Sequence, residues 1–163
     1  MQILAPEQRW IWQIAEETHL PLMSTIPDNI VAFEPILQEF PKLRLIIDHA
    51  GRHPRGAQDE AAWADADQLY ALARFEHVGV KVSSLPCFST QTYPFANLHA
   101  PIRKLYDTFG PQRLMWGSDA TRLTCSYADN IRLFTEALDF LSEDEKSWIM
   151  GRALAKALDW PIL

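Results

Sequence analysis

Two side chains suited to acid–base chemistry, those of His49 and Asp119, each follow a short apolar run in this 163-residue chain. The runs end at Ile47 and Trp116. A carboxylate can accept a proton from water, and an imidazole can polarise a carbonyl group or transfer a proton near neutral pH. If the two runs are strands of one sheet, the pattern predicts one acid–base site.

Both residues also have an interpretation without chemistry. A histidine at a strand end can satisfy its ring nitrogens locally, and Asp119 can cap the turn that follows it. Gly117-Ser118 lets the backbone turn sharply before Asp119, which favours a carboxylate that points into a pocket. Lys81 lies within an apolar run, where its amine needs a pocket or a polar partner, unless the strand is an edge strand and the stem reaches water.

The elements that must position these residues alternate along the chain. We expect strands at residues 22–25, 43–48, 78–83 and 113–117. We expect helices from Pro6, at residues 31–40, 62–75, 98–109 and 127–141, and after Ser142. The adjacent Ile46 and Ile47 are typical of a strand buried on both faces of a parallel sheet.

Apolar residues at helical spacing predict the packed face of most helices. Gly110 supplies a left-handed stop for helix 98–109, and Ser142 with Glu145 forms a capping-box pattern. The residues expected to face inward are Trp10, Ile11, Ile14, Ala15, Leu69, Leu72, Ala73, Leu98, Ile102, Leu105, Phe109, Ile131, Phe134, Leu138, Leu141, Ile149, Ala153, Leu154 and Ala157.

Strands that alternate with helices predict an α/β protein with a parallel sheet and right-handed crossovers. Four strands can make a small doubly wound sheet, or they can make half of a barrel, since a complete barrel needs about 250 residues. We expect one domain over residues 1–163. In either architecture ligands bind at the carboxyl ends of the strands. Residues 24–25, 48–53, 81–84 and 117–122 should therefore meet on one rim.

Two of these strand ends resemble a known family. Residues 45–52, Leu-Ile-Ile-Asp-His-Ala-Gly-Arg, resemble the sixth-strand signature of the amidohydrolase-2 group in the amidohydrolase superfamily. Residues 114–119, Leu-Met-Trp-Gly-Ser-Asp, resemble its eighth-strand signature, and residues 144–160 resemble its closing helix. The resemblance implies a partial TIM (β/α)₈ barrel in which the four βα units correspond to strands five to eight, followed by a C-terminal helix. The chain would then be the C-terminal half of the barrel.

The resemblance also assigns roles. The eighth-strand aspartate, here Asp119, binds a divalent metal such as zinc in metal-dependent members and helps to deprotonate water. The sixth-strand histidine, here His49, polarises the substrate. The fifth-strand histidine of the family is absent, because that strand ends in Ser24-Thr25. A tight zinc site needs at least three protein ligands. We therefore assign no metal ligand, and the cofactor of the complete protein stays open.

The branch that this pattern favours is similar to metal-free lactonases. We expect the complete protein to hydrolyse a lactone or related small carboxylated substrate with water activated by Asp119. His49 and Lys81 would stabilise the oxyanion, Arg122 would pair with a substrate carboxylate, and Tyr93 and His99 would line the pocket. Two alternatives remain: a metal-dependent decarboxylase, and a non-catalytic or truncated barrel fragment that needs strands one to four from elsewhere.

Composition and charge limit the kinds of partner that we expect for this protein. The net charge is −6 and no cluster of lysine and arginine forms a basic patch, so we expect no nucleic-acid partner. No apolar run approaches the length of about 20 residues that crosses a membrane, and the first residues lack a signal-peptide pattern. We therefore expect a cytoplasmic location and a small-molecule substrate. A half-barrel by itself would be inactive, and its open edges predict self-association or a missing N-terminal half-barrel.

Overall fold

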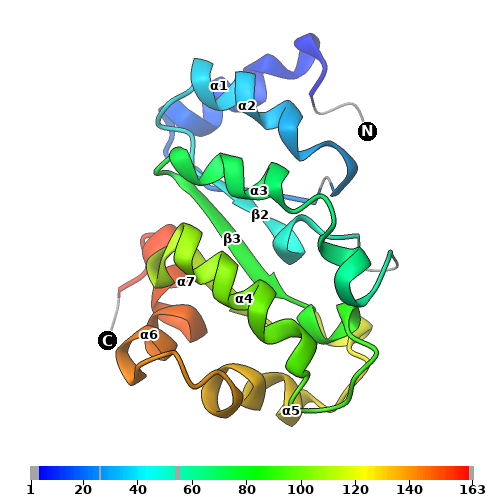
Figure 1. Cartoon of the computed structure of the whole chain (residues 1–163). Coiled ribbons are helices and arrows are strands. Elements are labelled where there is room, and N and C mark those ends of the chain that lie inside the picture. Colours follow the sequence, from blue (N-terminus) through cyan, green and yellow to red (C-terminus); the bar gives the residue numbers. More distant parts are fainter. Residues whose placement is uncertain (1–3, 26, 54–55, 162–163) are drawn as a thin grey trace.

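The computed structural model describes residues 4–25, 27–53 and 56–161. It contains one parallel sheet with α-helices between and after the strands (Figure 1). The strands are β1 (Leu22–Ser24), β2 (Leu45–Ile47), β3 (Val78–Ser83) and β4 (Leu114–Gly117). The α-helices are α1 (Arg9–Glu17), α2 (Phe33–Glu39), α3 (Asp67–Ala71), α4 (Ala96–Phe109), α5 (Tyr127–Arg132), α6 (Glu143–Ser147) and α7 (Ala153–Ala157).

The strand order decides between the two architectures that the sequence left open. The order is β1-β2-β3-β4, and every neighbouring pair is parallel. A doubly wound sheet reverses its order at a switch point and carries helices on both faces. Here each strand is added beside the previous one, and α3 and α4 lie on the same side of β3 (Figure 1). The fold is therefore α/β with the architecture of a partial (β/α)₈ barrel, as predicted.

The two faces of the sheet bury different residues. Leu45, Ile47, Val78 and Val80 alternate onto one face and belong to the main hydrophobic core under the helices. Between them, Ile46 pairs in register with Gly79, and Lys81 with Met115. On that second face Ile46 and Met115 pack against Ala153 of α7. The C-terminal helix thus covers part of the face that would line a barrel's interior.

Helix α4 and the start of α6 agree with the sequence prediction. The four predicted inward residues of α4 are all buried: Leu98, Ile102, Leu105 and Phe109. Ser142 and Glu145 form both hydrogen bonds of the capping box. Gly110 has a positive φ of 72°, but its ψ of 162° is extended rather than left-handed. A glycine tolerates either conformation, so the sequence could not separate them.

The prediction for the packed face of the first helix was right for Ala15 and wrong for Trp10 and Ile14. Trp12 and Ala15 are buried in α1, and Trp12 meets Phe33 edge to face at 6.0 Å. Trp10 and Ile14 are 57% and 48% exposed. The helix has apolar residues on two faces, and helical spacing alone does not say which face meets the core.

Three predicted helices are less regular than expected. The closing helix after Ser142 divides into α6, a π segment at Trp148–Arg152 and α7. Residues 62–75 divide into a 3₁₀ turn at Asp59–Trp63, helix α3 and a second 3₁₀ turn at Leu72–Arg74. After α5 the chain continues as a π turn at Leu133–Ala137 and leaves helical geometry at Leu138. Several predicted inward residues are only half-buried, namely Ile11, Ala73, Ile131, Leu154 and Ala157. Apolar spacing marks a face but does not fix which hydrogen-bond pattern the backbone uses. No helix in the described ranges is long and apolar enough to cross a bilayer.

Candidate functional site at the carboxyl rim

The carboxyl ends of β2, β3 and β4 bring together four of the six residues that the sequence nominated. His49 follows β2, Lys81 lies near the end of β3, and Asp119 and Arg122 follow β4. The charges of Lys81, Asp119 and Arg122 all act on the imidazole of His49. The rule that ligands bind at the carboxyl ends of parallel strands therefore located a cluster of titratable groups.

A left-handed turn after β2 places His49 on the rim. His49, Ala50 and Gly51 have φ values of 54°, 50° and 67°. Residues with side chains rarely adopt this conformation, and a Cβ atom at Gly51 would lie 2.2 Å from Cδ1 of the buried Ile30, so glycine is favoured there. The buried Arg52 donates from Nε to the carbonyl oxygen of Ala50 at 3.1 Å. The Ala-Gly-Arg sequence after His49 thus stabilises the turn that holds the imidazole.

Both ring nitrogens of His49 face polar groups. Its Nδ1 lies 2.8 Å from Oγ of Ser83, and its Nε2 lies 3.7 Å from Oδ2 of Asp119. At 3.7 Å the two atoms are too far apart for a hydrogen bond, but the negative charge of Asp119 favours the tautomer with the ring proton on the nearby Nε2. Nδ1 is then an acceptor, and the Ser83 hydroxyl donates to it. Burial lowers the pKa of His49, although Asp119 and Asp48 act in the opposite direction. A neutral imidazole with Nε2–H on the rim follows.

Asp119 presents one oxygen to the protein and keeps the other available. Ser84 donates its hydroxyl proton to Oδ2 at 2.6 Å, and Nε of Arg122 lies 3.5 Å from the same atom. Within the described chain, Oδ1 of Asp119 makes no hydrogen bond or ion pair. Asp119 has a left-handed backbone, and its side chain does not cap the turn at Ala120–Arg122. The capping interpretation of Asp119 is therefore wrong.

Lys81 has the partner that a mid-strand amine needs. Its Nζ lies 2.9 Å from Oδ1 of Asp48, and Thr25 donates to Oδ2 of the same carboxylate at 3.2 Å. Because β3 is an interior strand, the edge-strand interpretation of Lys81 is wrong. Asp48 connects the ends of three strands, and its charge also acts on His49.

The structure places Tyr93 and His99 away from this cluster. The Tyr93 hydroxyl donates to Glu136 at 3.4 Å, and the guanidinium of Arg132 lies over its ring. Nε2 of His99 lies 2.9 Å from the carbonyl oxygen of Pro94. Tyr93 thus contacts α5 and the π turn after it, and His99 contacts the loop before α4. Their role in lining the pocket stays a prediction.

Three residues of the rim were assigned no functional role from the sequence: Asp48, Ser83 and Ser84. All three stand at strand ends, so the rule that selected His49 also marked them. Their chemistry was not evident because an aspartate or serine beside a strand usually serves a turn. Only the packed structure shows that their polar atoms meet Lys81, His49 and Asp119.

The rim does not provide the ligands of a metal centre by itself. No group of three or more histidine, cysteine, aspartate or glutamate side chains in the described chain could hold a metal ion. A stable zinc site uses three or four such ligands. His49 and Asp119 supply only two, and Nδ1 of His49 is already engaged by Ser83. The residues of this chain therefore do not fit a metal site without further ligands.

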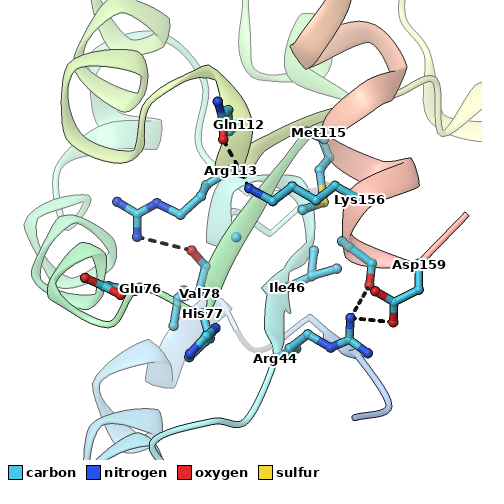
Figure 2. Close-up of a pocket in the computed structure, with 13 residues that line it drawn as sticks. Arg44, Ile46, Glu76, His77, Val78, Gln112, Arg113, Met115, Lys156 and Asp159 are labelled. Carbon is cyan, nitrogen blue, oxygen red and sulfur yellow. Dashed lines mark hydrogen bonds and ion pairs between the residues drawn. The ribbon is translucent and has the colours of Figure 1, made fainter. Parts of the chain in front are cut away.

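A cavity of about 420 Å³ lies at the opposite end of the strands, beside α7 (Figure 2). Its cationic side chains have partners within the wall. Arg44 pairs with Asp159, Arg113 donates to the carbonyl oxygen of Val78, and Lys156 donates to the side chain of Gln112. Barrel active sites form at the carboxyl ends of strands. We therefore place the candidate site at the rim and not in this cavity.

A partial barrel with a histidine and an aspartate on its carboxyl rim is the arrangement expected of an amidohydrolase. Comparison with known proteins agrees with this class. Residues 3–159 match the model of the amidohydrolase family, so the chain belongs to that family. Over 105 residues the chain is 30% identical to the L-fucono-1,5-lactonase of Burkholderia ambifaria. That match covers 63% of this chain and 36% of the lactonase.

Solved structures share the fold. A zinc-bound amidohydrolase from Burkholderia multivorans has a TM-score of 0.80 at 24% identity, with 96% of this chain and 58% of that chain covered. A protein described as a 2-pyrone-4,6-dicarboxylic acid hydrolase from Pseudomonas putida has a TM-score of 0.72 at 24% identity, with 100% and 60% covered. The 5-carboxyvanillate decarboxylase of Sphingomonas paucimobilis has a TM-score of 0.68 at 16% identity, with 99% and 56% covered. This chain thus spans between 36% and 60% of the length of each relative.

Proposed function

We propose that the assembled protein hydrolyses a lactone or a related small carboxylated substrate. By the assembled protein we mean this chain together with the strands that close its sheet. The observation that carries the proposal is the arrangement around Asp119, where Ser84, His49 and Arg122 gather on Oδ2 and leave Oδ1 available. The distant lactonase relative and the pyrone hydrolase neighbour support a substrate with a cyclic ester.

The proposed reaction begins with water beside Oδ1 of Asp119. The carboxylate takes a proton as the water oxygen forms a bond to the carbonyl carbon, which gives a tetrahedral oxyanion. The Nε2–H group of His49 donates to that oxyanion, and the ammonium of Lys81 adds positive charge at the rim. When the ring C–O bond breaks, the leaving oxygen takes the proton back from Asp119. Arg122, whose side chain is 48% exposed, can bind a substrate carboxylate.

The deciding variant is Asp119→Asn, which keeps the size of the side chain and removes the base. We expect kcat to fall by at least about 100-fold, because general-base catalysis is worth roughly 10²–10⁴ in rate. The control is Asp107→Asn, which alters an exposed ion pair with Arg103 on α4 and should leave kcat unchanged. Hydrolysis of a panel of sugar lactones and pyrone carboxylates is followed in the assembled protein. Activity of Asp119→Asn within about tenfold of the parent would contradict the role of Asp119.

Decarboxylation is the second candidate, because a decarboxylase shares the fold. The two reactions differ in their products: decarboxylation releases carbon dioxide, whereas lactone hydrolysis opens a ring and releases a proton. They also differ in their expected response to a chelator, because the proposed hydrolysis uses no metal ligand from this chain and should not be inhibited. Complete loss of activity after chelation would overturn the metal-free form of the proposal.

A further inference from the structure

Two adjacent serines interact with the two residues proposed to carry the chemistry. Ser83 lies 2.8 Å from Nδ1 of His49, and Ser84 donates to Oδ2 of Asp119 at 2.6 Å. Both serines are buried, with 3% and 0% of their surface exposed. We propose that Ser83 and Ser84 are positioning residues: Ser83 fixes the ring of His49, and Ser84 fixes the carboxylate of Asp119. The inference rests on the proposed function of His49 and Asp119.

The backbone at Ser84 explains how two consecutive hydroxyls reach one site. Neighbouring side chains in a strand point to opposite faces of the sheet. Ser83 is the last residue of β3 and shares a face with Lys81. Ser84 has left-handed dihedral angles of φ 59° and ψ 13°, which turn the chain and bring its hydroxyl to the rim. This conformation costs a residue with a side chain roughly 1–2 kcal/mol, yet the position is not a glycine.

Gly117 provides the space that Ser83 needs. Ser83 and Gly117 are partners in the register of β3 and β4. A Cβ atom at position 117 would lie 3.2 Å from Cβ of Ser83, which is tighter than ordinary contact. A residue with a side chain at position 117 would therefore require Ser83 to shift by a few tenths of an ångström. The glycine before Ser118-Asp119 thus leaves room for the serine on β3 that contacts His49.

Each serine controls a different part of the proposed reaction. The Ser83 hydroxyl occupies Nδ1 as a donor, so the single ring proton stays on Nε2, where it can reach a developing oxyanion. The Ser84 hydroxyl occupies Oδ2 and keeps Oδ1 of Asp119 available for water. In this scheme both hydroxyls contact protein groups and not the substrate. They act through His49 and Asp119 and are therefore not catalytic residues.

Ser84→Gly separates positioning from folding. Glycine removes the hydrogen bond to Asp119 but also relieves the left-handed backbone. These two effects oppose each other, so the melting temperature should stay close to that of the parent. We nevertheless expect kcat to fall by about 10- to 100-fold with a change in KM below about threefold, because misplacing a reacting group by 1 Å can cost about 10² in rate. The control is Ser89→Ala, which deletes a buried hydroxyl that contacts Asn97. Its kcat should match that of the parent.

Nitrogen-15 NMR of His49 tests Ser83 without an activity assay. In the parent we expect the neutral ring to carry its proton on Nε2, with Nδ1 showing the shift of a hydrogen-bonded acceptor. In Ser83→Ala the Nδ1 signal should move to the value of an unbonded acceptor, and in Ser89→Ala it should not move. A proton on Nδ1 in the parent, or identical ring signals in Ser83→Ala, would overturn the role of Ser83.

The two proposals fail in different ways. If the parent hydrolyses no lactone, the proposed function fails, and the NMR measurement alone decides whether Ser83 holds His49. If the parent is active but Ser84→Gly keeps kcat within about threefold, the positioning role of Ser84 fails while the hydrolase proposal stands. A loss of kcat that parallels a loss of thermal stability would also overturn it.

Discussion

At the scale of single residues, the rim shows how environment assigns roles to ordinary side chains. His49 and Asp119 are 15% and 21% exposed, and each has one polar atom engaged by a buried serine. The groups that face His49 are Asp119, Asp48, Arg122 and Lys81, two of each sign. Because these charges largely oppose one another, burial decides the direction in which the pKa of His49 moves.

The lowered pKa of His49 predicts a pH dependence of stability. As the pH falls, the unfolded chain protonates this histidine near its ordinary pKa of 6.5, whereas the folded protein resists protonation to a lower pH. The contribution of His49 to stability is therefore complete above pH 6.5 and is lost as the pH falls through the folded pKa. Urea unfolding between pH 8 and pH 5 checks this, with His49→Gln expected to lose less stability than the parent over that range.

The control for this measurement is His77→Gln, which removes an exposed histidine before β3. Its stability should follow that of the parent at every pH. If the parent and His49→Gln lose the same free energy of unfolding between pH 8 and pH 5, the neutral state of the folded imidazole is contradicted.

At the scale of elements, short strands are held in place by specific contacts at the ends of helices. Helix α6 begins with the capping box of Ser142 and Glu145, and the Tyr106 hydroxyl of α4 also donates to Glu145. This joins the start of the C-terminal helical segment to α4. The same segment packs Ala153 on Ile46 and Met115 of the sheet. The capping box therefore helps to orient the segment that covers the inner face.

Removing the cap should destabilise the protein by a modest amount. Ser142→Ala deletes the hydroxyl that accepts from the backbone N–H of Glu145, and we expect the free energy of unfolding to fall by about 1 kcal/mol. Ser147→Ala in the same helix is the matched control, because Ser147 is exposed and alanine favours a helix. Chemical denaturation measures both variants. Equal effects of the two substitutions would contradict the cap as the source of stability.

At the scale of the whole molecule, the sheet is open. Within the described residues, β1 pairs only with β2, and β4 pairs only with β3. Met23 of β1 is 40% exposed, and Trp10 and Leu20, which precede β1 in the chain, are more than half exposed. Unpaired strand edges beside apolar side chains favour association with other strands. We propose that a second copy or further barrel strands cover these edges in the working protein.

The 163-residue chain by itself should therefore self-associate. We expect its sedimentation coefficient to rise with concentration over the micromolar range. Met23→Lys places a charge on the open strand β1 and should reduce the association. Val31→Lys alters another exposed apolar residue outside the sheet and serves as the control. A single monomeric species at all concentrations would contradict the prediction.

The sequence by itself determined the four strands, the α/β class, the partial-barrel resemblance and the positions of His49 and Asp119. Strand spacing and residue type carry this information locally, because apolar runs and the residues after them mark buried strands and their ends. The buried face of α4 and the capping box were also readable, since both depend on residues within one helix.

The tertiary structure alone decided which polar groups meet. It paired Lys81 with Asp48, brought Ser83 to His49 and Ser84 to Asp119, and turned Trp12 of α1 inward in place of Trp10. These outcomes depend on strand order, register and left-handed backbone turns, which join residues far apart in the chain. Local periodicity contains no information about such contacts, so the partners of His49 and Asp119 emerged only when the strands were placed side by side.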